Sequence, residues 1–177
     1  VEPVVVHRQS RWLILFWLGY MKKRIKNIPG LQEAKDTTQI LYCVREAMCQ
    51  NPKLIQQYVV ENPDKLDARE LVIVENWQRF IHGQFVCLQA GKKHATLLRW
   101  EGKKKMHAYH VLGITDPIST VAKKRLLLRN ILLLPWEDKI IWDSLVPGGI
   151  FLGPNIWRGV LDDYQQLKQK HKPINKL

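Results

Sequence analysis

The spacing at which apolar residues recur changes near His82 and Gly83, and this change limits the possible folds more than any other feature of the sequence. Upstream, apolar residues return roughly every three to four positions, which is typical of amphipathic helices. Downstream, they alternate with polar residues or form short runs bounded by turns, which is typical of strands. We therefore predict an α+β protein with a helical N-terminal part over 1–82 and a strand-rich part over 83–177. Because the boundary is too short for a free linker, we expect the two parts to pack together.

The N-terminal part is expected to form a bundle of about four helices, separated by breaks that contain proline and glycine. The first contains the apolar segment 12–21, and the others begin near Asp36, Pro52 and Asp67. Asp36 is a suitable N-cap residue, and Pro52 suits a first helical turn. Asp67 with Glu70 has the sequence pattern of a capping box, which marks the start of the fourth helix.

The C-terminal part is expected to form a small antiparallel sheet. Five or six short strands are predicted at 84–88, 94–100, 106–114, 126–134, 139–142 and 150–152. Short strands joined by tight turns are typical of a sheet that curls toward a barrel, because curling leaves few exposed edges. Pro154 then suits the first turn of a closing C-terminal helix. The polar tail from Lys168 to Leu177 is expected to fray.

The charge of the chain is strongly positive and unevenly distributed. The 28 basic and 16 acidic residues give a net charge of +12, and residues 81–130 alone carry ten basic and two acidic residues. Such an excess favours polyanionic partners or an anionic membrane surface. Lysines at turns can reach several phosphates and release condensed counterions, while tryptophan and tyrosine can stack on bases. The predicted nucleic-acid contacts are Lys92, Lys93, Arg99, Trp100, Lys103, Lys104, Lys105, Tyr109, Lys123, Lys124, Arg125 and Arg129.

That basic surface has an alternative interpretation, because lysines collect at turns and edge strands to prevent aggregation. In that case Trp100 and Tyr109 would belong to the core. A solvated face without a partner, an acidic protein partner and a membrane surface are the alternatives to nucleic acid.

The apolar segment 12–21 is flanked by basic residues on both sides. Ten residues are about half of the ~20 needed to cross a bilayer, so we predict a buried helix and no transmembrane segment. The alternatives are a helix lying in a membrane surface and a helix that docks on a protein partner. The predicted partner-binding residues are Trp12, Phe16, Trp17 and Tyr20.

No catalytic or metal-binding pattern stands out. A zinc site could be drawn from Cys87, His94, His107 and His110, but residues three apart on a strand point to opposite faces, which separates His107 from His110. The three cysteines are odd in number, which argues against a disulfide framework and suits a reducing compartment. We therefore expect a cytoplasmic protein that is not an enzyme and uses no metal or other cofactor.

Several short motifs resemble a set of uncharacterised prokaryotic intracellular proteins that join a helical N-terminal part to a C-terminal sheet. The motifs lie at 61–66, 71–77, 83–85, 112–118, 134–136 and 140–143, in the same order. The resemblance covers residues 50–167 and implies a shared architecture and a prokaryotic, intracellular protein. It implies no activity.

Taken together, these features predict a non-enzymatic accessory module. Its basic sheet is expected to contact RNA or DNA backbone, with recognition that is mostly electrostatic. The alternative is an adaptor subunit of a larger prokaryotic complex, which would dock on a partner or a missing domain through its apolar N-terminal helix.

Overall fold

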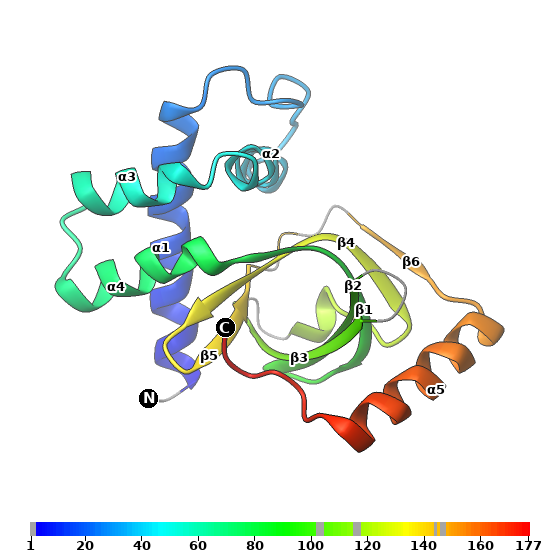
Figure 1. Ribbon diagram of the computed structural model, residues 1–177. Coiled ribbons are helices and arrows are strands. Elements are labelled where there is room, and N and C mark those ends of the chain that lie inside the picture. The colour runs from blue at the N-terminus through cyan, green and yellow to red at the C-terminus, as the bar shows by residue number, and fades with distance from the viewer. Residues whose placement is uncertain (1–2, 102–104, 115–117, 144, 146–147) are drawn as a thin grey trace.

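A computed structural model describes residues 3–101, 105–114, 118–143, 145 and 148–177, with side chains from residue 13 onward. Helices come first along the chain and strands follow, so the predicted α+β class is confirmed (Figure 1). The helices are α1 (Pro3–Arg24), α2 (Thr37–Cys49), α3 (Lys53–Glu61), α4 (Ala68–Asn76) and α5 (Pro154–Lys170), with one-turn 3₁₀ helices η1 (Trp77–Arg79) and η2 (Ile118–Thr120). The strands are β1 (Ile81–Ala90), β2 (His94–Glu101), β3 (Lys105–Gly113), β4 (Leu126–Trp136), β5 (Lys139–Trp142) and β6 (Gly149–Phe151).

Helix starts follow the local sequence signals. The Asp36 carboxylate accepts a hydrogen bond from the Gln39 backbone N–H at 2.9 Å and caps α2. At α4, the Asp67 side chain accepts from the Glu70 N–H while the Glu70 carboxylate accepts from the Asp67 N–H, which completes the predicted capping box. Pro154 occupies the first turn of α5, where its missing N–H costs nothing.

The strands form a ring of hydrogen bonds. The order β1-β2-β3-β5-β4 returns to β1, because β4 pairs with β1 as well as with β5. β6 lies outside this ring on the edge of β4. Among the pairings between the described strands β1 to β6, β3–β5 alone is parallel, so the sheet is mixed and the predicted antiparallel arrangement is wrong at this one pairing. Between β3 and β4 the chain crosses the ring through η2, whose Ile118 lies in the core of the ring. Because β4 is antiparallel to both β1 and β5, β5 runs in the same direction as β3.

The interior of the ring is apolar. It contains Phe85, Leu97, Tyr109 and other buried residues, and Ile118 of η2 packs among them. A Cβ atom on Gly113 would come within 2.7 Å of the Ile118 side chain, so this position on β3 requires glycine. Close packing between β3 and η2 therefore selects glycine at position 113.

A second core joins the helices to the ring. Trp17 of α1 and Trp77 of η1 pack edge to face with centroids 5.1 Å apart, in the same cluster as Trp136 and Ile141 of the sheet. The Trp77 indole N–H donates to the Pro135 carbonyl at 3.1 Å. The two parts of the chain therefore share buried apolar surface, with the helices on one side of the ring and α5 on another (Figure 1).

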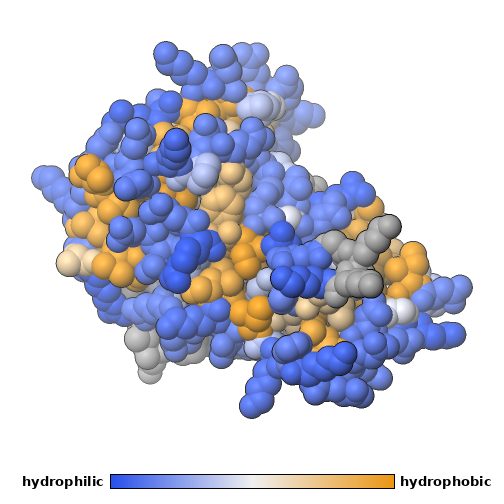
Figure 2. Space-filling view, viewed as in Figure 1, coloured by the Kyte–Doolittle hydropathy of each residue, from blue (hydrophilic) through white to orange (hydrophobic). Residues whose placement is uncertain are grey.

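The helix α5 covers the outer face of β1, β2 and β3. Its Trp157 and Val160 pack on Val86, Leu98 and Ala108. The solvent-facing side of α5 is mostly hydrophilic (Figure 2), and Ile156 near its start is exposed.

The tail beyond α5 does not fray as predicted. The Ile174 N–H donates to the Ala108 carbonyl at 2.7 Å, and the His110 N–H donates to the Ile174 carbonyl at 2.8 Å, so the tail lies parallel to β3 at Tyr109. The Ile174 and Leu177 side chains pack against the core of the ring. The prediction of a frayed tail rested on the polar composition of the segment and did not take Ile174 and Leu177 into account.

Candidate nucleic-acid interface

The predicted basic residues do not form one patch. Lys92 and Lys93 lie in the β1–β2 turn, whereas Lys105 begins β3 beside the β2–β3 turn. The eight-residue strand β2 separates these turns. At about 3.3 Å per residue, the separation exceeds about 20 Å. Lys103 and Lys104 lie outside the described residues.

Three of the predicted contacts have structural roles. Arg99 lies 5.9 Å from the Phe85 ring centroid and 3.6 Å from the Glu101 carboxylate, at one end of the ring. Tyr109 is 3% exposed inside the ring, so no base can reach its face. The Arg125 guanidinium donates to the Leu152 carbonyl at 2.8 Å and fastens the segment after β6. The alternation of strand residues predicts that neighbours point to opposite faces, but it does not say which face lies inside.

The remaining predicted basic residues lie on another side of the sheet. Lys123, Lys124 and Arg129 are exposed in and just before β4. The Lys124 ammonium lies 5.8 Å from the Trp157 ring centroid, beside the first turns of α5. Lys124 thus lies near the start of α5, whereas Lys105 lies near the other end of that helix, in the lining that it shares with Lys170.

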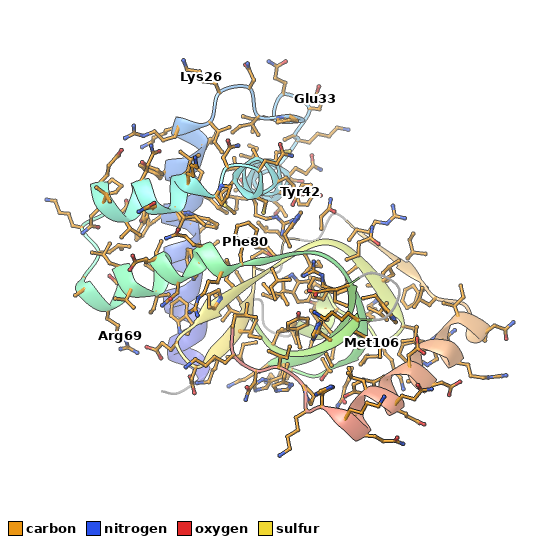
Figure 3. All side chains as sticks on the ribbon, viewed as in Figure 1. Lys26, Glu33, Tyr42, Arg69, Phe80 and Met106 are labelled. Atoms are coloured by element: carbon orange, nitrogen blue, oxygen red, sulfur yellow. The ribbon has the colours of Figure 1, made fainter. Side chains whose placement is uncertain are left out.

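An open cleft of about 770 Å³ does combine cations with an exposed aromatic ring. It lies between the β2–β3 hairpin and the C-terminal end of α5, and we call it the Trp100 cleft. Its lining consists of Trp100, Lys105, Met106, His107, Ala108, Asp163, Gln166, Leu167, Lys170, His171, Lys172 and Ile174. Met106 is labelled in Figure 3, where it lies between the ring and α5.

The strand register and the tail together build this cleft. Trp100 and Met106 are directly opposite each other on β2 and β3, so their side chains share the outer face of the sheet. Trp100 is 37% exposed and offers part of its ring to solvent. Lys170 ends α5 and Lys172 lies in the short connection to Ile174, so the docked tail fixes their backbone positions.

Sequence reasoning missed Lys170, His171 and Lys172, because it treated the tail as frayed. Pro173, Ile174 and Leu177 were the signal that could have indicated docking, since they are apolar residues in an otherwise polar segment. Asp163 is the acidic residue among the described lining of the cleft, so the balance of charge there is positive.

A second polar cluster lies between the helices and the ring, with two of its members buried and two partly exposed. The Arg45 guanidinium lies 2.8 Å from the Asp143 carboxylate and 2.9 Å from Glu46, and Glu46 lies 3.1 Å from the His82 imidazole. Arg45 also lies over the Tyr42 ring, which is at the junction of α2 and the ring of strands (Figure 3). Arg45 and Asp143 are buried, so a substrate has no access to them.

Burial changes the pKa of Asp143 in this cluster. Burial raises the pKa of Asp143 to about 6, although the positive charge of Arg45 opposes the shift.

Burial also raises the pKa of Cys49 to about 12 and that of Cys87 to about 11. These thiols are therefore protonated at neutral pH and are poor nucleophiles.

The histidines considered for a zinc site separate in space. His107 lies 3.6 Å from Glu101 at one end of the ring, whereas His110 stacks on His94 on the outer face. Across the described ranges, no three His, Cys, Asp or Glu side chains form a group that could hold a metal ion.

The predicted partner-binding residues of α1 are mostly internal. Trp17 and Tyr20 are buried against Trp77 and Tyr58, whereas Phe16 is 40% exposed. The side chain of Trp12 lies outside the described part of the chain. In that part, no helix has the length and apolarity needed to cross a membrane.

Comparison of the chain with models of known protein families, with curated proteins and with solved structures gives no match. The resemblance to prokaryotic proteins over 50–167 therefore stays a prediction.

Proposed function

We propose that this protein binds single-stranded RNA or DNA, without an enzymatic step, in the Trp100 cleft. The observation that carries the proposal is the exposed Trp100 ring with Lys105, Lys170 and Lys172 around one concave surface. An indole face accepts a stacked base of any identity, and ammonium groups neutralise the phosphates on either side of that base.

The expected recognition is electrostatic with little base readout. Lys105 approaches from the β2–β3 hairpin, whereas Lys170 and Lys172 approach from α5 and the tail. A strand lying between them contacts phosphates from two sides while one base stacks on Trp100. Asp163 lies in the same lining and repels phosphate, so the path of the strand is expected to avoid that side.

The architecture supports the same proposal by analogy. Small oligonucleotide-binding barrels bind on the faces of their second and third strands. Trp100 lies on β2 and Lys105 on β3 of a closed ring of strands, which we interpret as a small barrel with α5 against its outer face. Fold analogy alone does not establish a function, and the contacts in the cleft carry the argument.

The test is a titration with a short labelled single strand at several salt concentrations between about 50 and 200 mM. In a variant with Lys105→Ala, Lys170→Ala and Lys172→Ala, the slope of log affinity on log salt should fall by about 2, since each single-strand phosphate contributes about 0.7. Trp100→Ala should weaken binding about fivefold to a hundredfold with an unchanged slope, because stacking is worth about 1–3 kcal/mol.

The matched control replaces Lys22, Lys23 and Lys26 with alanine, which removes the same charge from exposed positions at the end of α1. Lys26 lies at the far side of the helical part from α5 (Figure 3). Equal losses in the two triple variants would show attraction to net charge alone. Affinity that is absent at low salt, or constant with salt, would contradict the proposal.

A second candidate function is an adaptor that docks on a protein partner. Val60 and Val72 are 79% and 55% exposed on α3 and α4, and Figure 2 shows apolar side chains gathered over these helices. Because Trp17 belongs to the core, deleting α1 would unfold the helical part and test nothing. The informative change is Val60→Lys with Val72→Lys, which should abolish co-purification of a partner while leaving oligonucleotide binding unchanged.

A further inference from the structure

A second hollow lies at the other end of β2 from the Trp100 cleft, beside the β1–β2 turn. Its volume is about 410 Å³, and its lining consists of Gln89, Gly91, Lys92, Lys93, His94, Ala95, Thr96 and His110. We call it the His94 hollow. It differs from an ordinary lysine-rich turn because it places two imidazoles beside two ammonium groups.

The imidazoles are arranged by the sheet. In the register of β2 and β3, His94 is opposite Leu112 and His110 is opposite Thr96, so the two histidines are diagonal neighbours on the outer face. Their rings stack with centroids 4.9 Å apart and planes inclined by 14°. Their ring nitrogens therefore border the same space.

The turn that carries the lysines is held from outside. The Lys93 carbonyl accepts from the Gly113 N–H at 3.1 Å, and the Lys92 carbonyl accepts from the Ile118 N–H at 2.9 Å. Both lysine backbones are thus fixed relative to β3 and η2. The long side chains remain exposed and can close over a bound group.

The charges around the hollow lack a negative counterpart. No carboxylate belongs to its lining among the residues that the structure describes. Burial, followed by the positive charges of His110, Lys93 and Lys139, lowers the pKa of His94. Lys139 itself pairs with Asp138 at 3.1 Å, so that aspartate is engaged by the lysine of its own turn. An anion in the hollow would offset the repulsion that His94 experiences from the neighbouring positive charges.

We propose that the His94 hollow binds a phosphate group, which the two imidazoles and the ammonium groups of Lys92 and Lys93 hold together. The group belongs either to a free phosphate ester or to a nucleic acid. Binding favours protonation of His94, because an anion beside the stacked rings stabilises its imidazolium form. By linkage, affinity rises as the pH falls through the range in which His94 titrates. This site goes beyond the Trp100 cleft and does not depend on it.

The experiment follows the imidazole NMR signals of the full chain during titration with inorganic sulfate, an oxyanion whose charge does not change in this pH range. Chloride at equal ionic strength is the control for salt. Sulfate should shift the His94 and His110 signals and bind about tenfold more tightly at about pH 5.5 than at about pH 7.5, which corresponds to one pKa unit of coupling. Constant affinity over this range, or unshifted signals, would overturn the proposal.

Variants separate this site from its neighbours. His94→Gln with His110→Gln should remove the pH dependence, and Lys92→Ala with Lys93→Ala should weaken sulfate binding at both pH values. His171→Gln, which changes an imidazole in the Trp100 cleft, should leave the sulfate-induced shifts of His94 and His110 unchanged. Wild-type behaviour of the His94 and His110 double variant would overturn the assignment.

Two further ligands identify the source of the phosphate. Shifts of His94 and His110 by a 5′-phosphorylated single strand, in the Lys105, Lys170 and Lys172 variant as well, would assign the site to nucleic acid. Shifts by inorganic phosphate without any by the strand would assign it to small phosphate esters. Absence of shifts with both ligands would contradict the proposal.

Discussion

Arg45 and Asp143 are 98 positions apart in the sequence and meet in a buried ion pair between α2 and the end of β5. Asp143→Ala is expected to lower the free energy of unfolding by about 1–3 kcal/mol, because the buried Arg45 guanidinium loses a hydrogen-bond acceptor and keeps only the Glu46 carboxylate as a partner. Urea unfolding at about pH 8 measures this, since the carboxylate is then ionised. The control is Glu137→Gln, which breaks the exposed pair with Arg69 and should cost less than about 1 kcal/mol. Equal costs for the two variants would contradict the expectation.

Single residues also show where sequence reasoning succeeds and where it stops. The capping box of Asp67 and Glu70 was predictable because its partners are three positions apart. The role of Arg99 was not, because it depends on Phe85, a residue of another strand that faces the same end of the ring. Local hydrogen bonds follow from local sequence, whereas the inner face of a closed ring is defined by strands that are distant in the chain.

At the scale of elements, the strands were recognisable and their partners were not. Their alternating patterns locate β1 to β6 within a few residues, but the parallel pairing of β3 with β5 depends on the crossing through η2. The Trp100 cleft was only half predictable for the same reason. Its lysines on the tail approach Trp100 because Ile174 joins β3, and no local pattern specifies that contact.

The docked tail leads to a prediction for β3. Ile174→Pro removes the N–H that donates to Ala108 and should weaken the returning bond from His110. The His110 amide is then expected to exchange with solvent about tenfold faster, which corresponds to the loss of one hydrogen bond. Hydrogen exchange followed by NMR measures it, with the Gly113 amide as internal control because it donates to Lys93. Equal acceleration at both amides would indicate general loosening and contradict a local role for the tail.

At the scale of the whole molecule, the shared core predicts one unfolding unit. Leu132, Trp136 and Ile141 of the sheet pack in the same cluster as Trp17 and the other helical residues. Helix content by circular dichroism and tertiary packing by tryptophan fluorescence should therefore be lost in one transition in urea. Trp136→Ala should shift both probes together by about 3–5 kcal/mol. Two separate transitions, or a stable fragment 83–177, would contradict this.

The contact of Ile174 with β3 also has a consequence for synthesis on the ribosome. The outer edge of β3 at Ala108 and His110 is translated long before its partner at Ile174. Until that partner emerges, the nascent chain presents an open strand edge, which is a pairing site for chaperones or for other nascent chains. The tail thus closes this open edge of β3 only when synthesis of the segment around Ile174 is complete.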